Sequence, residues 1–275
     1  MNMLAFIDWN VSPEIFAFGF LKIRWYGLLY VTGLMLGYYV LAYFFKKENK
    51  KEKDLESLMM TLVFSVIIGA RLGHCLFYDP VYYLSNPLKI LMIWQGGLAS
   101  HGAAIMILIT MWWYSNKRKP DITMMWLLDR IVIGVALAGT LIRIGNFFNH
   151  EIVGIESDLP WAVMFNRDTN PAHAAVARHP AQLYEALSYF VIFIILFFRY
   201  MKHTFKIPKG QTFGIFLVLT FSARFFIEMI KEEQSTFEAA MFLNMGQLLS
   251  LPFIIAGIIF LIWSRKNIYQ ESNME

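Results

Sequence analysis

Residues 122–154 read ITMMWLLDRIVIGVALAGTLIRIGNFFNHEIVG, and this stretch decides the fold. Its first part is apolar except for Asp129 and Arg130, and it has the length of about 20 residues that a helix needs to cross a bilayer. The apolar run then ends in Arg143, two asparagines and Glu151. Ionisable groups at the mouth of a membrane span are costly unless something holds them there, so they indicate a functional site.

The composition of the whole chain is that of a polytopic membrane protein. Of its 275 residues, 57% are hydrophobic, 17% are aromatic and only 16% are charged, whereas a soluble domain carries about a quarter charged residues. Residues 1–20 lack a basic start followed by a short apolar run, so we expect no cleavable signal peptide. The single cysteine, Cys75, excludes an internal disulfide and a cysteine-based metal site. The histidines show no metal-ligand spacing either, so we expect no metal ion and no cofactor.

Basic residues gather in alternate connections between the apolar segments. Because the positive-inside rule places such loops in the cytoplasm, the amino terminus lies outside, the carboxyl terminus lies inside, and the number of spans is odd. We therefore expect an all-α polytopic membrane protein, a single integral membrane domain over 1–275 with about seven transmembrane helices and an external, periplasmic cap at 147–181. The spans are predicted at about 19–43, 56–78, 91–114, 122–146, 182–200, 213–230 and 244–263.

This orientation places most polar groups of the spans within roughly 12 Å of the outer surface, at the helical rise of 1.5 Å per residue. A cavity open to one leaflet favours an enzyme that acts on a lipid head group over a transporter, which more often has polar residues through its full depth or broken helices at the midplane. Two G-x-x-x-G pairs, in the first and second spans, predict close helix packing. Their residues are Gly33 and Gly37, and Gly69 and Gly73.

The segment that begins at Arg143 has the residue types of a phosphate clamp. A guanidinium offers a rigid fork of donors, Asn146 can donate through its amide, and Gly145 lets the backbone approach a ligand. Arg224 and Glu228 are four residues apart and share a helix face. They are either a structural ion pair or a second arginine of the clamp with the carboxylate that orients it, and the two readings are compatible.

Two further residues have a functional and an ordinary interpretation. His101 lies in the predicted third span, near mid-membrane, among glycines that would loosen or break a helix. It is either a buried neutral histidine or a general base whose ordinary pKa suits that task. Tyr26 precedes Gly27 at the start of the first span and is equally consistent with an interface aromatic. We expect Asp129 and Arg130 to form a structural pair.

Taken together, these stretches resemble the prolipoprotein diacylglyceryl transferase family over nearly the whole chain. The matching segments, in order, are IRWYG at 23–27, GARLG at 69–73, WQGG at 94–97, RIGNFFNHEIVG at 143–154, HPAQLYE at 179–185, RFFIE at 224–228 and MGQ at 245–247. The sequence departs from the family pattern at Thr220, where a tyrosine is usual, and after Glu228, where Lys231 stands in place of an arginine followed by Pro-Asp.

The resemblance implies a reaction and its partners. The diacylglyceryl group of phosphatidylglycerol passes to the lipobox cysteine of a prolipoprotein signal peptide, a thioether forms and glycerol phosphate leaves. It implies a multi-pass protein of the bacterial cytoplasmic (inner) membrane whose active site opens toward the outer leaflet, with no nucleic acid as a partner, and it leaves the oligomeric state open. The implied catalytic residues are His101, Arg143 and Arg224, and the implied substrate-binding residues are Tyr26, Arg143, Asn146, Glu151, Gly154 and Glu228.

Two other functions remain open on the residues alone. One is a different membrane enzyme that acts on an anionic phospholipid head group, such as a phosphatidyltransferase, which would need an acidic metal-binding cluster. The other is a transporter for an anionic solute, which would expose Arg143 and His101 to each side of the membrane in turn.

Overall fold

The computed structural model describes residues 6–18, 21–173, 176–203, 207–232 and 241–272. Most of these residues are helical. The long helices are α1 (Trp25–Lys47), α2 (Glu52–Phe77), α4 (Ser100–Arg118), α5 (Met124–Phe148), α6 (Ala181–His203), α7 (Gln211–Glu228) and α8 (Met245–Ser272). The short helices are α3 (Pro80–Ser85), η1 (Pro87–Leu91), η2 (Ile93–Gln95) and η3 (Pro171–His173).

Five short strands among the described residues correct the expectation of a purely helical chain. They are β1 (Ile7–Trp9), β2 (Glu14–Phe18), β3 (Leu21–Arg24), β4 (Val163–Phe165) and β5 (Ala177–Arg178). β2 and β3 form an antiparallel hairpin, and β4 lies between a parallel β1 and an antiparallel β5. The first helix therefore begins at Trp25, after the hairpin, and not at residue 19 as its apolar character suggested.

Within the described residues, six helices are long and apolar enough to cross a membrane. They are α1, α2, α5, α6, α7 and the Met245–Lys266 part of α8. The remaining predicted span, the third at about 91–114, corresponds to α4, which has 19 residues and is not among the six. The expected number of seven spans and their orientation stay predictions.

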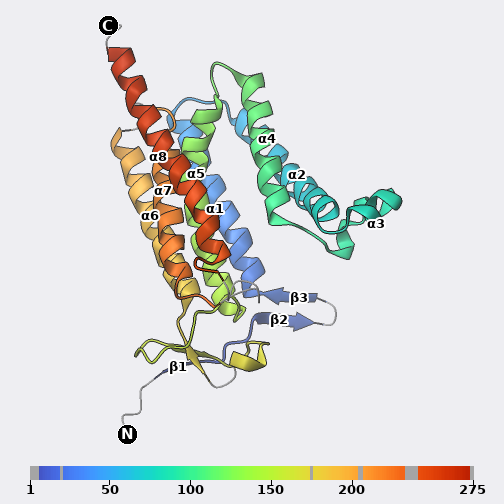
Figure 1. The fold of residues 1–275 in the computed structure, drawn as a ribbon. Helices are drawn as coiled ribbons and strands as arrows, with labels where there is room; N and C mark the ends of the chain where they lie inside the picture. Colours follow the sequence, from blue (N-terminus) through green and yellow to red (C-terminus); the bar gives the residue numbers. More distant parts are fainter. Residues whose placement is uncertain (1–5, 19–20, 174–175, 204–206, 233–240, 273–275) are drawn as a thin grey trace. The chain divides into compact units, whose positions relative to one another are not determined.

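The chain divides into two compact units, a larger one formed by residues 1–41 and 128–275 and a smaller one formed by residues 42–127. In the larger unit, α1, α5, α6, α7 and α8 run side by side, and the strands lie at one end of them (Figure 1). We call this the strand end. The first turns of α1, α6 and α8 and the last turns of α5 and α7 all lie there, because consecutive helices alternate in direction.

The glycines of α1 fit closely against α5, as the sequence predicted. A Cβ atom at Gly33 would lie 3.1 Å from the Cα atom of Ala138, and one at Gly134 would lie 3.1 Å from the Cα atom of Gly37. Small residues of this kind let two helix backbones approach in a membrane, where dispersion contacts drive association. The close contact fixes α5 relative to α1, and with it the position of Arg143 near the end of α5.

Asp129 and Arg130 form the structural pair that was expected, and Asp129 has a second role. Its carboxylate accepts hydrogen bonds from the backbone N–H groups of Gly210 (2.7 Å) and Phe213 (2.9 Å), and it lies 4.0 Å from the Arg130 guanidinium. The first N–H groups of a helix have no partner within the helix, and a carboxylate also interacts favourably with the positive end of the helix dipole. Asp129 on α5 thus caps α7.

In the smaller unit, α2 packs on α4 through Gly69 and Gly73, which lie against the backbone at Gly102. The third span was predicted to be one helix from residue 91, but α4 begins only at Ser100. The interruption comes from Gly96 and Gly97, whose φ angles of +84° and +72° suit a residue without a Cβ atom.

Arg71 on α2 explains why the segment before α4 keeps its shape. Its side chain donates to four backbone carbonyl groups, those of Lys89, Ile90, Gly96 and Gly97, over 2.5–3.2 Å. The residue is only 3% exposed. Arg71 thus holds the loop that precedes α4.

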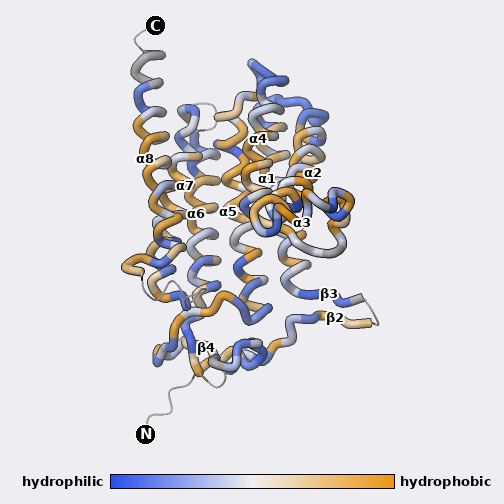
Figure 2. Tube along the Cα trace, turned by 45° about the vertical axis from the view of Figure 1, so that its right-hand side comes forward, coloured by the Kyte–Doolittle hydropathy of each residue, from blue (hydrophilic) through white to orange (hydrophobic). Residues whose placement is uncertain are grey.

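Hydrophobic residues occupy much of the length of the helices (Figure 2), and many of their side chains are exposed. Val31 on α1, Phe198 on α6 and Ile259 on α8 are 54%, 62% and 60% exposed. A soluble monomer rarely exposes a large apolar surface, whereas lipid tails solvate one well. The helices satisfy their own backbone groups, as a bilayer requires.

Candidate active site

The centre of the candidate site is Arg143, in the last turns of α5 at the strand end. Its Nε atom lies 2.9 Å from Oε2 of Glu185 on α6, and its Nη1 atom donates to Oδ1 of Asn146 at 3.3 Å. The Glu185 side chain is fully buried and that of Arg143 is 18% exposed. Burial of a charge is costly unless it is paired, so this ion pair fixes the direction of the guanidinium.

The second arginine is linked to the first through a chain of alternating charges. Nζ of Lys231 lies 3.8 Å from Oε1 of Glu185 and 3.0 Å from Oε2 of Glu228. Glu228 in turn lies 3.9 Å from Nε of Arg224, as expected for residues four apart on one helix. We call Arg143, Glu185, Lys231, Glu228 and Arg224 the charge chain.

The charge chain carries one positive charge more than its two carboxylates balance. Lys231 and Glu228 are nearly buried, with side chains 4% and 8% exposed, whereas the Arg224 side chain is 33% exposed. Donors held in advance in a water-poor site stabilise an anion strongly, because they need not reorganise when charge develops. The arrangement therefore suits a ligand with a phosphate group.

Asn146, Asn149 and Glu151 extend the site beyond α5. Oε1 of Glu151 accepts hydrogen bonds from the amides of Asn146 (2.7 Å) and Asn149 (3.2 Å). The Glu151 carbonyl accepts one from the amide of Gln182 on α6 at 2.6 Å. Ile152, a β-branched residue, has a φ angle of +61°, an unusual conformation that proteins tolerate mainly at functional sites.

Tyr26 joins the site from the first turn of α1. Gly145 makes room for it, since a Cβ atom there would lie 3.0 Å from Cδ2 and 3.2 Å from Cα of Tyr26. The phenol lies where it interacts electrostatically with Glu151 and Arg143. The Tyr26 ring therefore stands beside the polar cluster, and its position is fixed by backbone contact with α5.

Gly154 lies where three backbone segments cross. Its N–H donates to the His179 carbonyl at 2.9 Å, it forms an isolated β-bridge with Lys231, and a Cβ atom would lie 2.7 Å from the Ile230 carbonyl oxygen. A side chain does not fit here. The glycine thus helps to hold the backbone of Lys231, which is a member of the charge chain.

The cap segment 147–181 rests on the end of α5 through a small apolar core at the strand end. This core consists of Phe147, Val153, Val163 and Phe165, with Trp9 of β1 packed against it. Because β1 pairs with β4, the first strand of the chain and the cap form one layer. The cap is thereby fixed over the residues that follow Arg143.

Comparisons with known proteins give the family of this chain. Residues 13–263 match the model of the family described as prolipoprotein diacylglyceryl transferase. The chain belongs to this family. Three relatives are named phosphatidylglycerol–prolipoprotein diacylglyceryl transferase. The protein of Tolumonas auensis is 42% identical to this chain, and the match covers 94% of this chain and 97% of the relative. The protein of Chloroherpeton thalassium is 40% identical, with 98% of this chain and 99% of the relative covered. The protein of Bacteroides fragilis is 41% identical, with 96% of this chain and 98% of the relative covered.

The structure brings most of the predicted site residues of this family together in the larger unit. They are Tyr26, Arg143, Asn146, Glu151, Gly154, Arg224 and Glu228. His101 belongs to the smaller unit, where it is the second residue of α4 and not part of a continuous mid-membrane helix. It is exposed, and its ring centroid lies 5.0 Å from that of Phe77 and 5.9 Å from that of Tyr78.

Sequence reasoning missed three members of the site. Glu185 was noted only as part of the HPAQLYE segment at 179–185 and Lys231 only as a departure from the family pattern, although both belong to the charge chain. Tyr189 on α6 interacts with Arg143 and Arg224, so the site contains a phenol although position 220 is a threonine. The one available signal was spacing, since Glu185 and Tyr189 are four apart and share a helix face.

Proposed function

We propose that this protein transfers the diacylglyceryl group of phosphatidylglycerol to the lipobox cysteine of a prolipoprotein. Membership in the prolipoprotein diacylglyceryl transferase family carries the proposal, and the printed names of the relatives give both substrates. The charge chain supports it independently, because two guanidiniums linked through one buried lysine suit a phosphate better than a neutral solute.

The reaction in this proposal is a substitution at a glycerol carbon. The thiolate sulfur attacks the carbon that carries the phosphate ester, a C–S bond forms, and the C–O bond breaks with its electron pair left on the phosphate oxygen. Glycerol phosphate departs with more negative charge than the diester had, since a phosphate monoester has a second pKa of about 6. The barrier thus lies in making the thiolate and in stabilising the departing phosphate.

Arg143 and Arg224 address the departing phosphate. The planar fork of each guanidinium can donate to two phosphate oxygens at once, which the single ammonium of a lysine cannot do. Tyr26, Asn146, Glu151, Gly154 and Glu228 bind substrate or hold the arginines in place. His101 takes the thiol proton, since a free cysteine thiol has a pKa of about 8.5 and needs a base at neutral pH.

We also propose where the reaction takes place. The charge distribution of the loops supports an amino terminus outside and a carboxyl terminus inside a bacterial cytoplasmic membrane. The strand end and the cap 147–181 then face the periplasm, and the site opens to the outer leaflet. The chain acts as one integral membrane domain over 1–275, and the lipobox cysteine meets the lipid at the level of the head groups.

The test is a reconstituted reaction. Purified protein is incubated with phosphatidylglycerol and a lipobox peptide, and mass spectrometry follows the mass increase of the diacylglyceryl group. A peptide with serine in place of the lipobox cysteine is the control and must stay unmodified. Absence of the mass increase with the cysteine peptide, from protein that is folded by its thermal transition, would contradict the proposal.

A further inference from the structure

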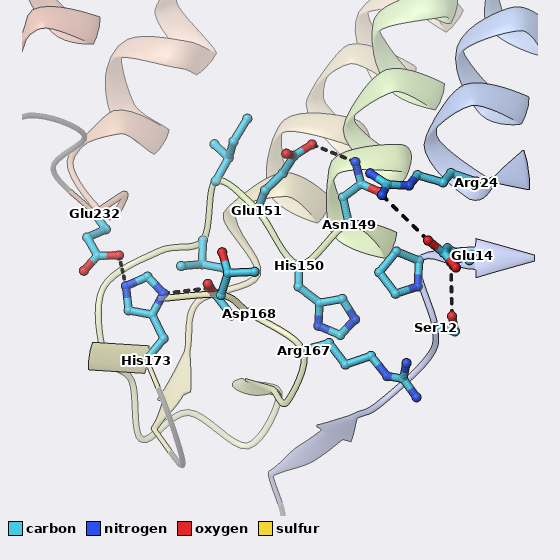
Figure 3. Close-up of a pocket in the computed structure, with 14 residues that line it drawn as sticks. Ser12, Glu14, Arg24, Asn149, His150, Glu151, Arg167, Asp168, His173 and Glu232 are labelled. Carbon is cyan, nitrogen blue, oxygen red and sulfur yellow. Dashed lines mark hydrogen bonds and ion pairs between the residues drawn. The ribbon is translucent and has the colours of Figure 1, made fainter. Parts of the chain in front are cut away.

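A polar pocket of about 830 Å³ lies beside Glu151 at the strand end of the larger unit. Figure 3 shows that its walls include the chain around Glu14, the cap with the turn after α5, and the side chains of Arg24 and Glu232. Of the residues that line it, the steps proposed above use only Glu151. Its volume is well within the range of ligand-binding pockets, about 300–1,000 Å³.

His150 is the group that points to a ligand. It lines the pocket, although the residue is only 1% exposed. Its Nε2 atom lies 2.9 Å from the Val11 carbonyl oxygen. Because a carbonyl only accepts, Nε2 carries the hydrogen, and the neutral ring then offers Nδ1 as an acceptor. Among the described residues this Nδ1 atom is buried and has no hydrogen-bond partner, which is costly unless a ligand donates to it.

The walls of the pocket also favour a ligand rich in donors. Four carboxylates line it and only two guanidiniums. The His173 ring, which lies between the carboxylates of Asp168 (2.6 Å) and Glu232, is already occupied. A second acceptor beside His150, Oδ1 of Asn149, is likewise buried without a partner among the described residues.

We propose that this pocket holds the segment of the prolipoprotein that follows the acceptor cysteine, as an extended peptide whose backbone N–H groups donate to His150 and to the wall carboxylates. The inference rests on the proposed function. Glu151 belongs to the pocket wall and is joined to Arg143 through Asn146 by hydrogen bonds of 2.7 and 3.3 Å. If the lipobox cysteine reacts beside Arg143 and Arg224, the residues that follow it in the prolipoprotein therefore enter this pocket.

The same argument disfavours the lipid head group as the occupant. A glycerol head group has three carbons, whereas an extended peptide advances about 3.3 Å per residue and fills a pocket of this size with a few residues. The apolar residues before the cysteine belong in the bilayer. Those after it must leave the membrane, and the pocket is built from strands and turns beyond the helix ends.

The experiment compares two acceptor peptides on the full-length protein. One ends at the lipobox cysteine as an amide, and the other continues for about six residues. We expect KM to be about tenfold lower for the longer peptide. The variant His150→Gln keeps an amide donor for the Val11 carbonyl but lacks the Nδ1 acceptor, and Thr169→Trp fills the pocket from an exposed wall residue. Both should raise the KM of the longer peptide about tenfold and leave the shorter peptide unchanged.

Asp158→Trp is the matched control, because Asp158 is exposed in the same cap segment and does not line the pocket. It should keep the preference for the longer peptide. An equal KM for both peptides in the wild type would overturn the proposal. The proposal would also be overturned if both pocket variants raised the KM of phosphatidylglycerol by the same factor with either peptide. The pocket would then bind the lipid head group.

Binding of the longer peptide in the absence of lipid separates this proposal from the proposed function. Fluorescence anisotropy measures its affinity for the wild type and for Thr169→Trp. An affinity about ten times weaker in the variant supports the pocket even if no thioether forms, in which case the transfer reaction is the part that fails. Equal affinities overturn the pocket even if transfer takes place.

Discussion

The replacement Arg143→Lys tests whether the shape of the guanidinium matters or only its charge. In the structure, Nε of Arg143 pairs with Glu185 at 2.9 Å and Nη1 contacts Asn146 at 3.3 Å, which leaves one edge of the fork for a ligand. A lysine keeps the charge but can direct its ammonium to only one of these partners. The loss of one hydrogen bond to a charged group costs about 1.5–3 kcal/mol. Taking about 2 kcal/mol, we expect kcat/KM for thioether formation to fall about thirtyfold.

The assay is the reconstituted transfer reaction, followed by the mass of the lipidated peptide over a series of phosphatidylglycerol concentrations. Arg199→Lys is the matched control, because Arg199 lies toward the other end of α6 and bonds to Gln211. It should keep wild-type activity. If Arg143→Lys stays within twofold of the wild type, charge alone suffices and the fork is not part of the mechanism.

Three further predictions concern the helix packing and the base. Gly134→Ala should lower the free energy of unfolding by about 1–3 kcal/mol, because the added Cβ atom would lie 3.1 Å from the Cα atom of Gly37. Thermal unfolding in detergent measures this change. Gly27→Ala is the neutral control, because a Cβ atom there would have no other atom within 4 Å. Asp129→Ala should lower the free energy of unfolding by about 1–3 kcal/mol for each amide left without a partner. Amide hydrogen exchange should become faster in the first turn of α7, and unchanged exchange there would show that Asp129 does not cap this helix. His101→Ala should slow thioether formation more than it weakens binding of phosphatidylglycerol, and equal turnover by the variant in the reconstituted assay would exclude the histidine as the base.

The helical part of the fold was predictable because it depends on short stretches of sequence. Apolar length placed most helices, and the glycine pairs predicted close helix packing, which Gly33 and Gly37 make between α1 and α5. Arg143, Asn146 and Glu151 are neighbours in the sequence, so their clustering followed from local geometry. Each of these predictions uses one helix or one turn at a time.

The rest depends on contacts between distant residues, which local patterns do not reveal. Lys231 reads as a surface lysine until α6 places Glu185 beside it. The strand pairing of β1 with β4 joins residues more than 150 positions apart, and β1 is too short to show an alternating pattern. The late start of α4 arises from the conformation at Gly96 and Gly97, whereas the apolar residues around them favour a continuous span.

A structure of the protein with bound phosphatidylglycerol would test the central claim most directly, namely that two guanidiniums joined through one chain of charges act on a single phosphate. We predict that the phosphate oxygens lie at hydrogen-bond distance, about 3 Å, from both Arg143 and Arg224. A phosphate held by only one of the two arginines, or by neither, would contradict the account.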